Sequence, residues 1–446
     1  MAVHGRGLKA ARRGALAGDV SAPGDKSISH RAMILGALAR GETVATGILE
    51  GHDVIRTAAA MRALGARVER DIAAAHGPVW RIEGAPWRAP DRRLYFGNSG
   101  TGCRLVIGAA AGRGVTAAFD GDQSLRARPM TRIAAPLEAM GARIGLSQGK
   151  LPASIEAAPL RAIDFEMPVA SAQVKSAILL AALGAKGTTR IVEPAPSRDH
   201  TERMLAAFGA DIAIGVRGGV RGGAREISLA GGADLTATRI ETPGDPSSAA
   251  FIAAAAAIAP GSDVLIRNVL VNPLRTGFFE TLKEMGAHIV FEKAREVSGE
   301  PVADIRVRGS SLKGVDVPAQ RAASMIDEYP ILAVVAAFAA GRTRMSGVGE
   351  LRVKESDRLA AVEAGLKSNG VKCESGADWL CVDSDGDVRG GGLVETHLDH
   401  RVAMSFLVMG LAADKPVEID DASMIATSFP GFVALMRELG AEISPR

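Results

Sequence analysis

The sequence predicts an α/β protein with two domains, each built from three copies of one unit whose helices are buried and whose sheets lie outside. Three observations carry this prediction. The chain has 446 residues, more than a single hydrophobic core usually organises. One short phrase recurs along it at intervals of roughly 70 to 80 residues, the size of a βαβαββ unit. Each interval also holds a stretch with helical spacing that is apolar on every side.

The recurring phrase consists of Gly, then Ala or Val, then a strand-like pair, and it follows a segment with helical periodicity. Glycine at that point suits the left-handed conformation that commonly ends a helix. A strand is expected after each copy. The six copies occupy residues 64–68, 140–144, 208–212, 285–289, 369–373 and 439–443.

The uniformly apolar stretches are expected to form buried helices, because such a helix has no polar face to present to water. Their small residues let neighbouring backbones approach closely, so three of them can share one interior with amphipathic helices and strands outside. Six such helices therefore predict two domains of three units. They are expected at residues 27–39, 101–111, 171–183, 247–259, 326–340 and 399–413.

The tripeptide Pro-Gly-Asp marks the expected domain boundaries. It occurs at residues 23–25 and 243–245, each time directly before a predicted buried helix. Pro and Gly are common where a chain passes between domains. We expect one domain over residues 21–242, and a second over residues 1–20 and 243–446 that the N-terminal strand completes.

Composition argues against several classes of function. The formal net charge of +3 gives no general basic field, so neither a nucleic acid nor a membrane surface is an expected partner. The apolar run at residues 249–259 is well short of the roughly 20 residues that span a bilayer. Three cysteines without C-x-x-C spacing argue against disulfides and against a zinc site. With no apolar stretch following the basic residues of the N-terminus, a secretory signal is not expected either, and a cytoplasmic protein without bound metal is predicted.

Polar residues gather at the expected starts of the buried helices. Helix N-termini carry unpaired N–H groups and a partial positive charge, so they attract anions. If both domains turn these ends toward each other, the cleft between them binds anionic molecules. The polar groups occupy residues 25–27, 98–101, 171–173, 245–248, 327–328 and 399–401.

Two of these places combine charges in a way that suits a phosphate or carboxylate. Ser27 and Arg31 are four residues apart and share a helix face, with Lys26 at the helix entrance. A helix cap with solvated charges is the alternative for this segment. Arg401 enters an otherwise apolar helix, where a charge needs a partner.

Arg128 is a further candidate for anion binding. It precedes Pro129, and proline is common at the first position of a helix, so the arginine is expected at another helix start. There its guanidinium suits a bidentate grip on a carboxylate or phosphate. A plain surface arginine is the alternative.

Five charged segments resemble the signature segments of the 5-enolpyruvylshikimate-3-phosphate synthase family, in the same order and over nearly the whole chain. The resemblance implies two domains of three βαβαββ units with the helices inside. It also implies a monomer of the shikimate pathway that transfers the enolpyruvyl group of phosphoenolpyruvate to the 5-hydroxyl of shikimate 3-phosphate, with release of phosphate and without metal or organic cofactor. The segments occupy residues 23–31, 97–104, 126–129, 351–359 and 399–404.

The resemblance also implies a set of binding residues for each substrate. Lys175 is a further candidate for the phosphate of shikimate 3-phosphate. Glycine rather than alanine at position 100 predicts inhibition by glyphosate, which competes for the phosphoenolpyruvate pocket in this family. For shikimate 3-phosphate the matching positions are Lys26, Ser27, Arg31, Ser171, Ala172, Gln173, Arg198, Asp327 and Lys354. For phosphoenolpyruvate they are Lys26, Gly100, Arg128, Gln173, Arg358 and Arg401.

The same resemblance implies the catalytic groups. Asp327 matches the family's residue at the 5-hydroxyl, Glu355 matches its proton shuttle near C3 of phosphoenolpyruvate, and Lys26 neutralises developing charge. A helix cap is the alternative for Asp327, and Glu328 shares or contests its role. The chain departs from many members at Thr427, where they carry a lysine, so no lysine contact is expected there.

Three other functions fit the sequence less well. The UDP-N-acetylglucosamine enolpyruvyl transferase uses a loop cysteine where this chain has Gln123, and a Lys-Asn pair where it has Lys26 and Ser27. A dinucleotide-dependent oxidoreductase needs Gly-x-Gly-x-x-Gly after a strand, and the glycines at residues 97–102 have another order. An RNA-binding or other anion-binding module is disfavoured by the near-neutral charge and the few aromatic residues.

Overall fold

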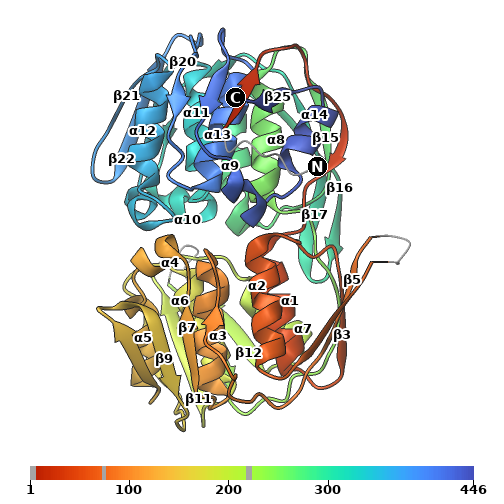
Figure 1. Ribbon diagram of the computed structural model, residues 1–446, viewed down its shortest axis with the longest axis vertical. Coiled ribbons are helices and arrows are strands. Elements are labelled where there is room, and N and C mark those ends of the chain that lie inside the picture. The colour runs from red at the N-terminus through yellow and green to blue at the C-terminus, as the bar shows by residue number, and fades with distance from the viewer. Residues whose placement is uncertain (1–6, 73–76, 217–223) are drawn as a thin grey trace. The chain divides into compact units, whose positions relative to one another are not determined.

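A computed structural model describes residues 7–72, 77–216 and 224–446 of the chain. By their contacts these residues form two compact units (Figure 1). The amino-terminal unit consists of Gly24–Thr242 with Val297–Glu300, and the carboxy-terminal unit consists of Met1–Pro23, Pro243–Glu296 and Pro301–Arg446. The chain therefore changes unit within the first Pro-Gly-Asp sequence and directly before the second.

The amino-terminal unit repeats the order helix, strand, helix and two antiparallel strands three times. The first repeat contains α1 (Lys26–Leu38), β3 (Glu42–Thr46), α2 (His52–Ala63), β4 (Arg67–Asp71) and β5 (Val79–Glu83). The second contains β6 (Leu94–Tyr95), α3 (Gly100–Gly112), β7 (Ala117–Asp120), the short α4 (Gln123–Ala127), α5 (Thr131–Ala139), β8 (Arg143–Ser147) and β9 (Lys150–Glu156). The third contains β10 (Asp164–Glu166), α6 (Ala172–Ala182), β11 (Thr188–Glu193), α7 (His200–Ala207), β12 (Ile212–Val216) and β13 (Arg225–Ala230), after which β14 (Arg239–Glu241) returns to the first sheet.

Each repeat of this unit contributes a four-stranded sheet. The strand orders are β14-β3-β5-β4, β6-β7-β9-β8 and β10-β11-β13-β12. In every sheet the first two strands are parallel and the others antiparallel, as a βαβαββ unit requires. The first strand of the first sheet, β14, comes from the end of the unit, so the three repeats close on themselves.

The carboxy-terminal unit has the same plan. Its first repeat contains β2 (Ala17–Ser21), α8 (Pro246–Ile258), β15 (Asp263–Leu270), α9 (Gly277–Glu284), β16 (His288–Val297) and β17 (Glu300–Arg308). The second contains β18 (Leu312–Lys313), β19 (Asp316–Val317), α10 (Ala322–Met325), α11 (Tyr329–Ala337), β20 (Ala339–Ser346), α12 (Arg358–Ser368), β21 (Lys372–Ser375) and β22 (Trp379–Ser384). The third contains β23 (Leu393–Val394), α13 (His400–Gly410), β24 (Val417–Ile419), α14 (Phe432–Glu438), β25 (Glu442–Pro445) and β1 (Leu8–Ala11).

The N-terminal segment completes two sheets of this unit rather than one. Strand β1 lies between β24 and β25 and is antiparallel to both. Strand β2 lies at the edge of a different sheet, parallel to β15. The sheet orders are β23-β24-β1-β25, β16-β17-β15-β2 and β18-β20-β22-β21, with β19 paired to β20. The expectation of a single completing strand is therefore too simple.

All six predicted buried helices are present, and the sheets surround them within each unit (Figure 1). Every residue of α8 and of α11 is buried. Small residues allow close packing: a Cβ on Gly108 of α3 would lie 2.3 Å from the carbonyl oxygen of Ala177 in α6. The prediction that helices form the interior and sheets the exterior is confirmed.

The glycines of the recurring phrase have the predicted left-handed conformation. Their φ angles lie between +83° and +114°, a region that residues with a Cβ rarely adopt. Each glycine follows the last turn of an outer helix and precedes a strand. They are Gly65, Gly141, Gly209, Gly286, Gly370 and Gly440.

One predicted helix begins later than expected. The apolar stretch at residues 326–340 forms α11 only from Tyr329, and Ala339 already belongs to β20. Pro330 occupies the first turn, which is where a helix tolerates proline because no N–H is needed there. Asp327 and Glu328 consequently precede the helix. Separately, no helix among the described residues is both long and apolar enough to span a bilayer.

Candidate functional site

The start of α1 carries the first group of predicted site residues. Asp25 caps the helix by accepting a hydrogen bond of 2.8 Å from the amide of Ile28. Lys26 forms an ion pair with Asp53 in the first turn of α2, and its side chain keeps 18% of its surface exposed. Ser27 is partly buried. The ammonium of Lys26 is thus oriented by a buried carboxylate and remains reachable from solvent.

Arg31, a predicted contact of shikimate 3-phosphate, is buried and engaged with protein atoms. Its Nε donates to Thr201 at 2.7 Å, Nη2 to Ser176 at 2.7 Å, and Nη1 to the carbonyl of Ser27 at 2.9 Å. Ser176 and Thr201 belong to α6 and α7, so Arg31 ties three helices together. These hydrogen bonds fix the guanidinium next to Ser27, and the predicted contact with shikimate 3-phosphate stays a prediction.

Gly100 lies between two buried arginines. It is the first residue of α3, which Ser99 caps. A Cβ on Gly100 would lie 2.9 Å from Nη1 of Arg104 and 3.0 Å from Nη1 of Arg128. The first distance is shorter than real Cβ atoms show and the second is tighter than most, so the absence of a side chain is what lets the two guanidiniums flank the helix start.

Arg128 lies at the end of a helix and not at the start of one. It terminates α4, while α5 begins at Thr131, so the predicted helix start at Pro129 is wrong by two residues. Arg128 has extended backbone angles, as expected for a residue before proline. Its Nη2 donates to the side chains of Asn98 and Ser124, the latter at 3.1 Å. The guanidinium is therefore fixed beside Gly100 by neutral acceptors.

The start of α6 carries a second polar group. Ser171 caps this helix by accepting from the amide of Val174 at 3.5 Å. Gln173 donates to Thr101 at 3.0 Å and accepts from Arg104 at 2.8 Å. Gln173 thus joins α6 to α3 next to Gly100. Ala172 and Ser171 are partly buried at the same helix start.

Arg104 is the residue that the sequence reasoning left out of the candidate site. It is buried, and its Nη2 also donates to the carbonyl of Pro129 at 3.2 Å. The signal was available, because Arg104 is a charge inside an otherwise apolar helix. The same criterion identified Arg401.

Lys175 does not form part of a phosphate site. It is fully buried and forms ion pairs with Glu193 at 2.9 Å and Glu202 at 2.8 Å. Two carboxylates around one ammonium leave a net negative charge, which repels a phosphate. Glu193 also accepts from Ser197, the neighbour of Arg198. The ammonium therefore fixes the loop that carries Arg198, and Arg198 itself is partly buried.

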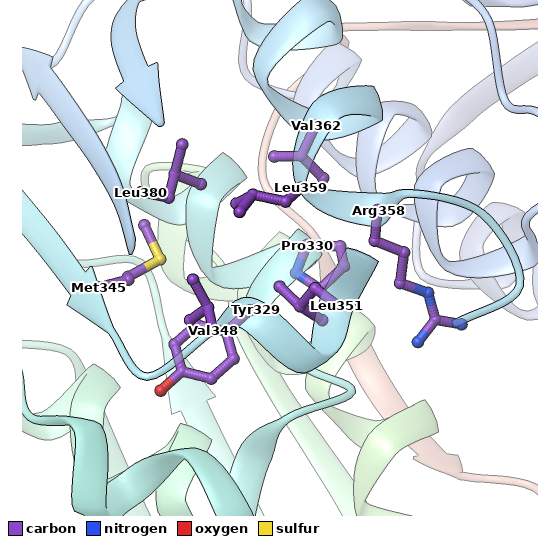
Figure 2. Close-up of a pocket in the computed structure, with 9 residues that line it drawn as sticks. All are labelled: Tyr329, Pro330, Met345, Val348, Leu351, Arg358, Leu359, Val362 and Leu380. Atoms are coloured by element: carbon purple, nitrogen blue, oxygen red, sulfur yellow. The ribbon is translucent and has the colours of Figure 1, made fainter. Parts of the chain in front are cut away.

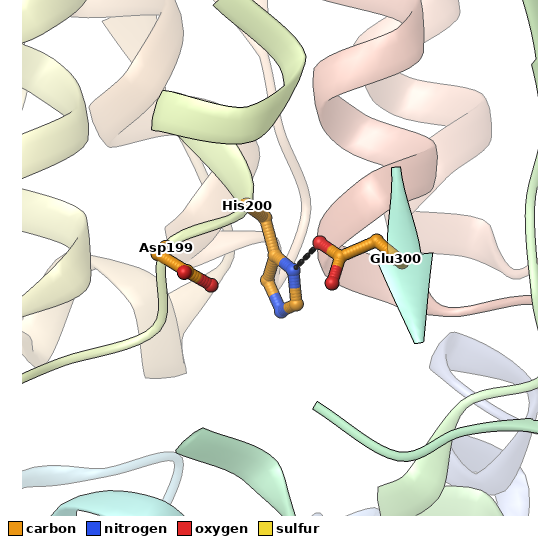
Figure 3. A group of neighbouring side chains, drawn as sticks. All are labelled: Asp199, His200 and Glu300. Atoms are coloured by element: carbon orange, nitrogen blue, oxygen red, sulfur yellow. Dashed lines mark hydrogen bonds and ion pairs between the residues drawn. The ribbon is translucent and has the colours of Figure 1, made fainter. Parts of the chain in front are cut away.

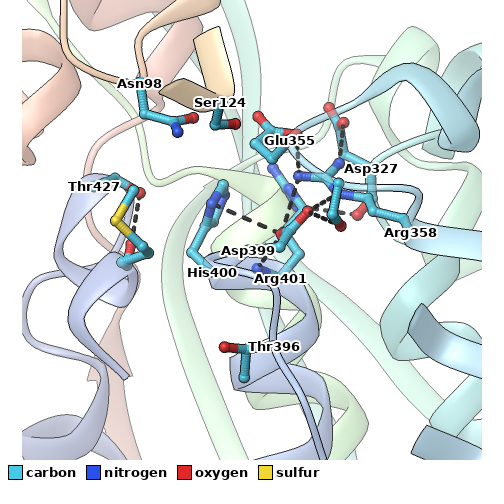
Figure 4. A network of polar contacts seen from close by, with 12 residues as sticks. Asn98, Ser124, Asp327, Glu355, Arg358, Thr396, Asp399, His400, Arg401 and Thr427 are labelled. Atoms are coloured by element: carbon cyan, nitrogen blue, oxygen red, sulfur yellow. Dashed lines mark hydrogen bonds and ion pairs between the residues drawn. The ribbon is translucent and has the colours of Figure 1, made fainter. Parts of the chain in front are cut away.

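In the carboxy-terminal unit, Arg358 joins three predicted or neighbouring carboxylates (Figure 4). It is the first residue of α12 and is 1% exposed. Its Nε donates to Asp399 at 2.8 Å, Nη1 to Asp327 at 3.3 Å, and Nη2 lies 2.5 Å from Glu355. Sequence positions 327, 355 and 399 thus meet at one guanidinium. The structure brings the two predicted acid–base residues into one cluster.

Burial and charge act in opposite directions on this cluster. Burial lowers the pKa of Arg358, but the carboxylates of Asp399, Glu355 and Asp327 raise it more. Burial raises the pKa of Asp399, but the charge of Arg358, its hydrogen bond and the charge of His400 together lower it more. The Arg358–Asp399 pair is therefore ionised on both sides at neutral pH. Asp327 and Glu355 each keep 17% of their side-chain surface exposed.

The carbon chain of Arg358 emerges from a dry, apolar pocket (Figure 2). This pocket has no room for a water molecule. Arg358 is the only lining residue with a formal charge, and its guanidinium points away from the apolar side chains of the pocket. The other lining residues are Tyr329, Pro330, Met345, Val348, Leu351, Leu359, Val362 and Leu380.

Arg401 presents a different pattern of contacts. It is the second residue of α13, and its amide donates to Asp399 at 2.9 Å. Its Nη1 donates to the backbone carbonyl of Asp327 at 3.1 Å and lies 3.5 Å from Oε1 of Glu328. Among the described residues, Nε and Nη2 of Arg401 make no hydrogen bond. That edge is the one with which a guanidinium binds a carboxylate or phosphate side-on.

Lys354 lies close to the same cluster. Its ammonium is 3.8 Å from Glu350 and keeps 23% of its side-chain surface exposed. Partial burial lowers its pKa, while Asp327 and Glu350 raise it by a smaller amount. At the departure from the family pattern, Thr427 is buried and donates to the carbonyl of Met424 at 2.6 Å.

One buried group among the described residues has the composition of a metal site (Figure 3). It consists of Asp199, His200 and Glu300, all in the amino-terminal unit. Nδ1 of His200 lies 2.7 Å from Glu300. Arg203 lies 3.0 Å from Asp199 and 3.6 Å from Glu300. The arginine already supplies the positive charge that a metal ion would bring, so the group does not fit a cation.

The family model of EPSP synthase (3-phosphoshikimate 1-carboxyvinyltransferase) matches residues 11–436. Relatives named 3-phosphoshikimate 1-carboxyvinyltransferase include one from Rhodopseudomonas palustris (strain BisA53), 57% identical over 98% of each chain, and one from Parvibaculum lavamentivorans, 56% identical over 98% of this chain and 97% of its own. A solved EPSP synthase from Acinetobacter baumannii has a TM-score of 0.84 and 43% identity, covering 98% of this chain and all of that one. The chain therefore belongs to the EPSP synthase (3-phosphoshikimate 1-carboxyvinyltransferase) family.

Proposed function

We propose that this chain transfers the enolpyruvyl group of phosphoenolpyruvate to the 5-hydroxyl of shikimate 3-phosphate and releases phosphate. The observation that carries the proposal is the family match over nearly the whole chain. The reaction places the product in the shikimate pathway to aromatic amino acids. Both substrates are anions, which agrees with the cationic side chains at the starts of α1, α3, α12 and α13.

The proposed reaction is an addition followed by an elimination. The 5-oxygen bonds to C2 of phosphoenolpyruvate, the proton of the hydroxyl goes to a base, and C3 takes a proton from an acid to become a methyl group. The tetrahedral intermediate then loses phosphate from C2 and a proton from C3, which restores the double bond. No oxidant or reductant is needed.

We assign the proton transfers to the carboxylates around Arg358. Asp327 takes the proton of the 5-hydroxyl, and Glu355 gives and removes the proton at C3. Both side chains are partly exposed, as a group that meets a substrate must be. Arg358 binds both carboxylates, with Nη1 at 3.3 Å from Asp327 and Nη2 at 2.5 Å from Glu355, and so fixes their positions. Lys26 offsets the charge that develops on the phosphate leaving group.

We propose a set of contacts for each substrate. For phosphoenolpyruvate the set is Lys26, Gly100, Arg128, Gln173, Arg358 and Arg401. Arg401 would bind through its Nε and Nη2 edge. For shikimate 3-phosphate we propose Lys26, Ser27, Arg31, Ser171, Ala172, Gln173, Arg198, Asp327 and Lys354. Arg31 also donates to Ser27, Ser176 and Thr201, which hold its guanidinium in place.

We further propose that the chain works as a monomer in the cytoplasm, without a nucleic-acid or membrane partner. The three cysteines are buried and free, which suits a reducing compartment. Gel filtration at several protein concentrations tests the monomer. Elution at twice the monomer mass, independent of ionic strength, would contradict it.

The activity is tested by measuring phosphate release from phosphoenolpyruvate, with and without shikimate 3-phosphate. The parent chain is expected to release phosphate only when both substrates are present. Asp327→Ala is expected to reduce kcat by a factor of about 10² to 10⁴, the usual contribution of a general acid or base, with little change in the unfolding free energy. UDP-N-acetylglucosamine serves as the control acceptor. Phosphate release with that sugar and none with shikimate 3-phosphate would refute the proposal.

A further inference from the structure

Glu328 is a buried carboxylate with an unusual set of contacts. It directly precedes α11, where its carbonyl accepts from the amide of Leu332 at 2.9 Å and its own amide donates to the carbonyl of Met325 at 2.9 Å. The backbone is therefore fixed on both sides. The residue is 2% exposed, whereas the side chain of its neighbour Asp327 keeps 17% of its surface exposed. Consecutive carboxylates thus have opposite environments.

The position of Glu328 at a helix start does not explain why a carboxylate is buried there. An acidic residue at a helix N-terminus usually accepts a hydrogen bond from an amide of the first turn. The carboxylate of Glu328 makes no such capping bond. Within the described part of the chain its Oε2 has no hydrogen-bond partner, and its Oε1 has only Nη1 of Arg401, at 3.5 Å.

Burial of the Glu328 carboxylate with so few partners lowers the stability of the folded chain. A buried carboxylate needs hydrogen bonds on its oxygens to offset its desolvation, and one long contact offsets little. An apolar residue of similar volume would suit the same place better for stability. A cost of this kind is often found beside a functional group.

The contacts of Arg401 indicate what Glu328 does. Nη1 of Arg401 has two acceptors, the backbone carbonyl of Asp327 and Oε1 of Glu328, both from the segment before α11. They leave the Nε and Nη2 edge of the guanidinium for an anion. Arg358 differs, because Asp399 takes its Nε and Asp327 and Glu355 take its terminal nitrogens.

We propose that Glu328 is a positioning residue, which holds Nη1 of Arg401 so that the Nε and Nη2 edge faces the phosphoenolpyruvate anion. This proposal rests on the proposed function. An arginine side chain loses rotamer freedom when it binds, and a side chain already fixed loses less. Without Glu328, the carbonyl of Asp327 is the one acceptor among the described residues that remains to orient the guanidinium. Glu328 therefore acts on substrate affinity through Arg401 and does not take part in proton transfer.

The proposal predicts a particular split between the kinetic constants. Arg401 contacts the anion before and during the reaction, so loss of its orientation weakens ground state and transition state alike. For Glu328→Ala we expect KM for phosphoenolpyruvate to rise about tenfold or more, which corresponds to the loss of one hydrogen bond to a charged group. KM for shikimate 3-phosphate and kcat are expected to change less than about threefold. Glu328→Gln keeps an acceptor at Oε1 and is expected to restore most of the affinity.

A second measurement separates positioning from a structural role. Asp304→Ala removes a buried carboxylate of β17 whose partners among the described residues are Asn268, Lys293 and Arg295, and not Glu328 or Arg401. This control is expected to lower the unfolding free energy and leave both KM values unchanged. In the background of Arg401→Ala, the change Glu328→Ala is expected to have almost no further effect on KM for phosphoenolpyruvate.

The outcomes distinguish this proposal from the function on which it rests. A parent chain that releases no phosphate would refute the proposed function. An active parent chain in which Glu328→Ala is less stable but keeps its KM for phosphoenolpyruvate would overturn the positioning role alone. The positioning role would also be overturned if the double variant raised KM for phosphoenolpyruvate by the product of the rises in Glu328→Ala and Arg401→Ala.

Discussion

The substitution Gly100→Ala tests the proposed phosphoenolpyruvate site with a single methyl group. The new Cβ would lie 2.9 Å from Nη1 of Arg104 and 3.0 Å from Nη1 of Arg128, whereas ordinary contacts begin at 3.4 Å. Each guanidinium must therefore move by about half an ångström. Neither can move without disturbing its partners, which are Gln173 for Arg104 and Asn98 for Arg128.

The expected loss concerns substrate binding and not stability. Displacement of a positioning group by about 1 Å can cost about a hundredfold in rate, so half of that predicts about a tenfold fall in kcat/KM for phosphoenolpyruvate, which we expect mainly as a rise in KM. The clash is with the ends of flexible side chains, and alanine is the better helix former. The unfolding free energy is therefore expected to change by less than about 1 kcal/mol.

The assay is steady-state phosphate release at varied phosphoenolpyruvate, together with urea unfolding. Gly431→Ala is the matched control, because a Cβ there would meet nothing within 4 Å. Gly102→Ala gives the opposite contrast: its Cβ would lie 2.4 Å from Oγ1 of Thr57, so this variant is expected to lose stability. Glyphosate is expected to inhibit the parent chain in competition with phosphoenolpyruvate, and to inhibit Gly100→Ala less.

The reasoning is refuted if Gly100→Ala binds phosphoenolpyruvate as tightly as the parent chain. It is refuted equally if the loss of affinity comes with a large loss of stability, since the clash would then act on the fold. Parent activity that is unaffected by high glyphosate would contradict the assignment of Gly100 to this pocket.

Three further predictions concern the buried ionisable groups. Arg358→Met leaves three carboxylates without their shared positive charge and is expected to lower the unfolding free energy by about 3 kcal/mol or more. The control Arg267→Met removes an exposed partner of Asp19 and should lower it far less. Equal losses in urea unfolding would contradict this prediction. Burial, together with the charges of Lys26 and Arg31, lowers the pKa of His30 well below its usual value, so the unfolded chain binds a proton at this residue more readily than the folded chain. The unfolding free energy should therefore fall as the pH drops below about 6.5, by up to about 1.4 kcal/mol per pH unit. His30→Gln should lack this part of the slope between about pH 7.5 and 5.5, and an unchanged slope would count against the prediction. Burial raises the pKa of Cys103 to about 12 and that of Cys373 to about 11. Neither thiol should therefore react with iodoacetamide at about pH 8 in the folded chain. Rapid alkylation of both, measured by mass spectrometry, would contradict this prediction.

Much of the fold follows from local features of the sequence. A helix that is apolar on every side has to be buried, and α8 shows this most clearly because all thirteen of its residues are buried. Glycine directly after an outer helix is expected to adopt the left-handed conformation, and all six copies have a positive φ angle. Such features depend on neighbours within a few residues. They could therefore be predicted without knowledge of the tertiary structure.

The partners of individual charges could not be predicted in the same way. Arg31 donates to Ser176 and Thr201, which are 145 and 170 residues away in the chain, so its guanidinium also ties α1 to α6 and α7. Lys175 is surrounded by Glu193 and Glu202, so a residue that suggested a phosphate contact is neutralised internally. In both cases the sequence offers the charge and only the packing of helices selects its partner.

Helix boundaries set a second limit on prediction. The apolar pattern around residue 326 suggested a helix start there, and Pro330 moved the start to Tyr329. The shift places Asp327 and Glu328 in the segment before α11, with different exposures and different arginine partners. Their division of roles, as proposed here, depends on that backbone position.

The central claim is tested most directly by nuclear magnetic resonance of the reaction in deuterated water. With phosphoenolpyruvate, shikimate 3-phosphate and the parent chain, the account predicts inorganic phosphate and an enol ether at the 5-oxygen. Deuterium should appear in the vinyl methylene of that product, because C3 becomes a methyl group in the intermediate and then loses one of its three hydrogens. No enol ether, or an enol ether whose methylene carries no deuterium, would contradict the account.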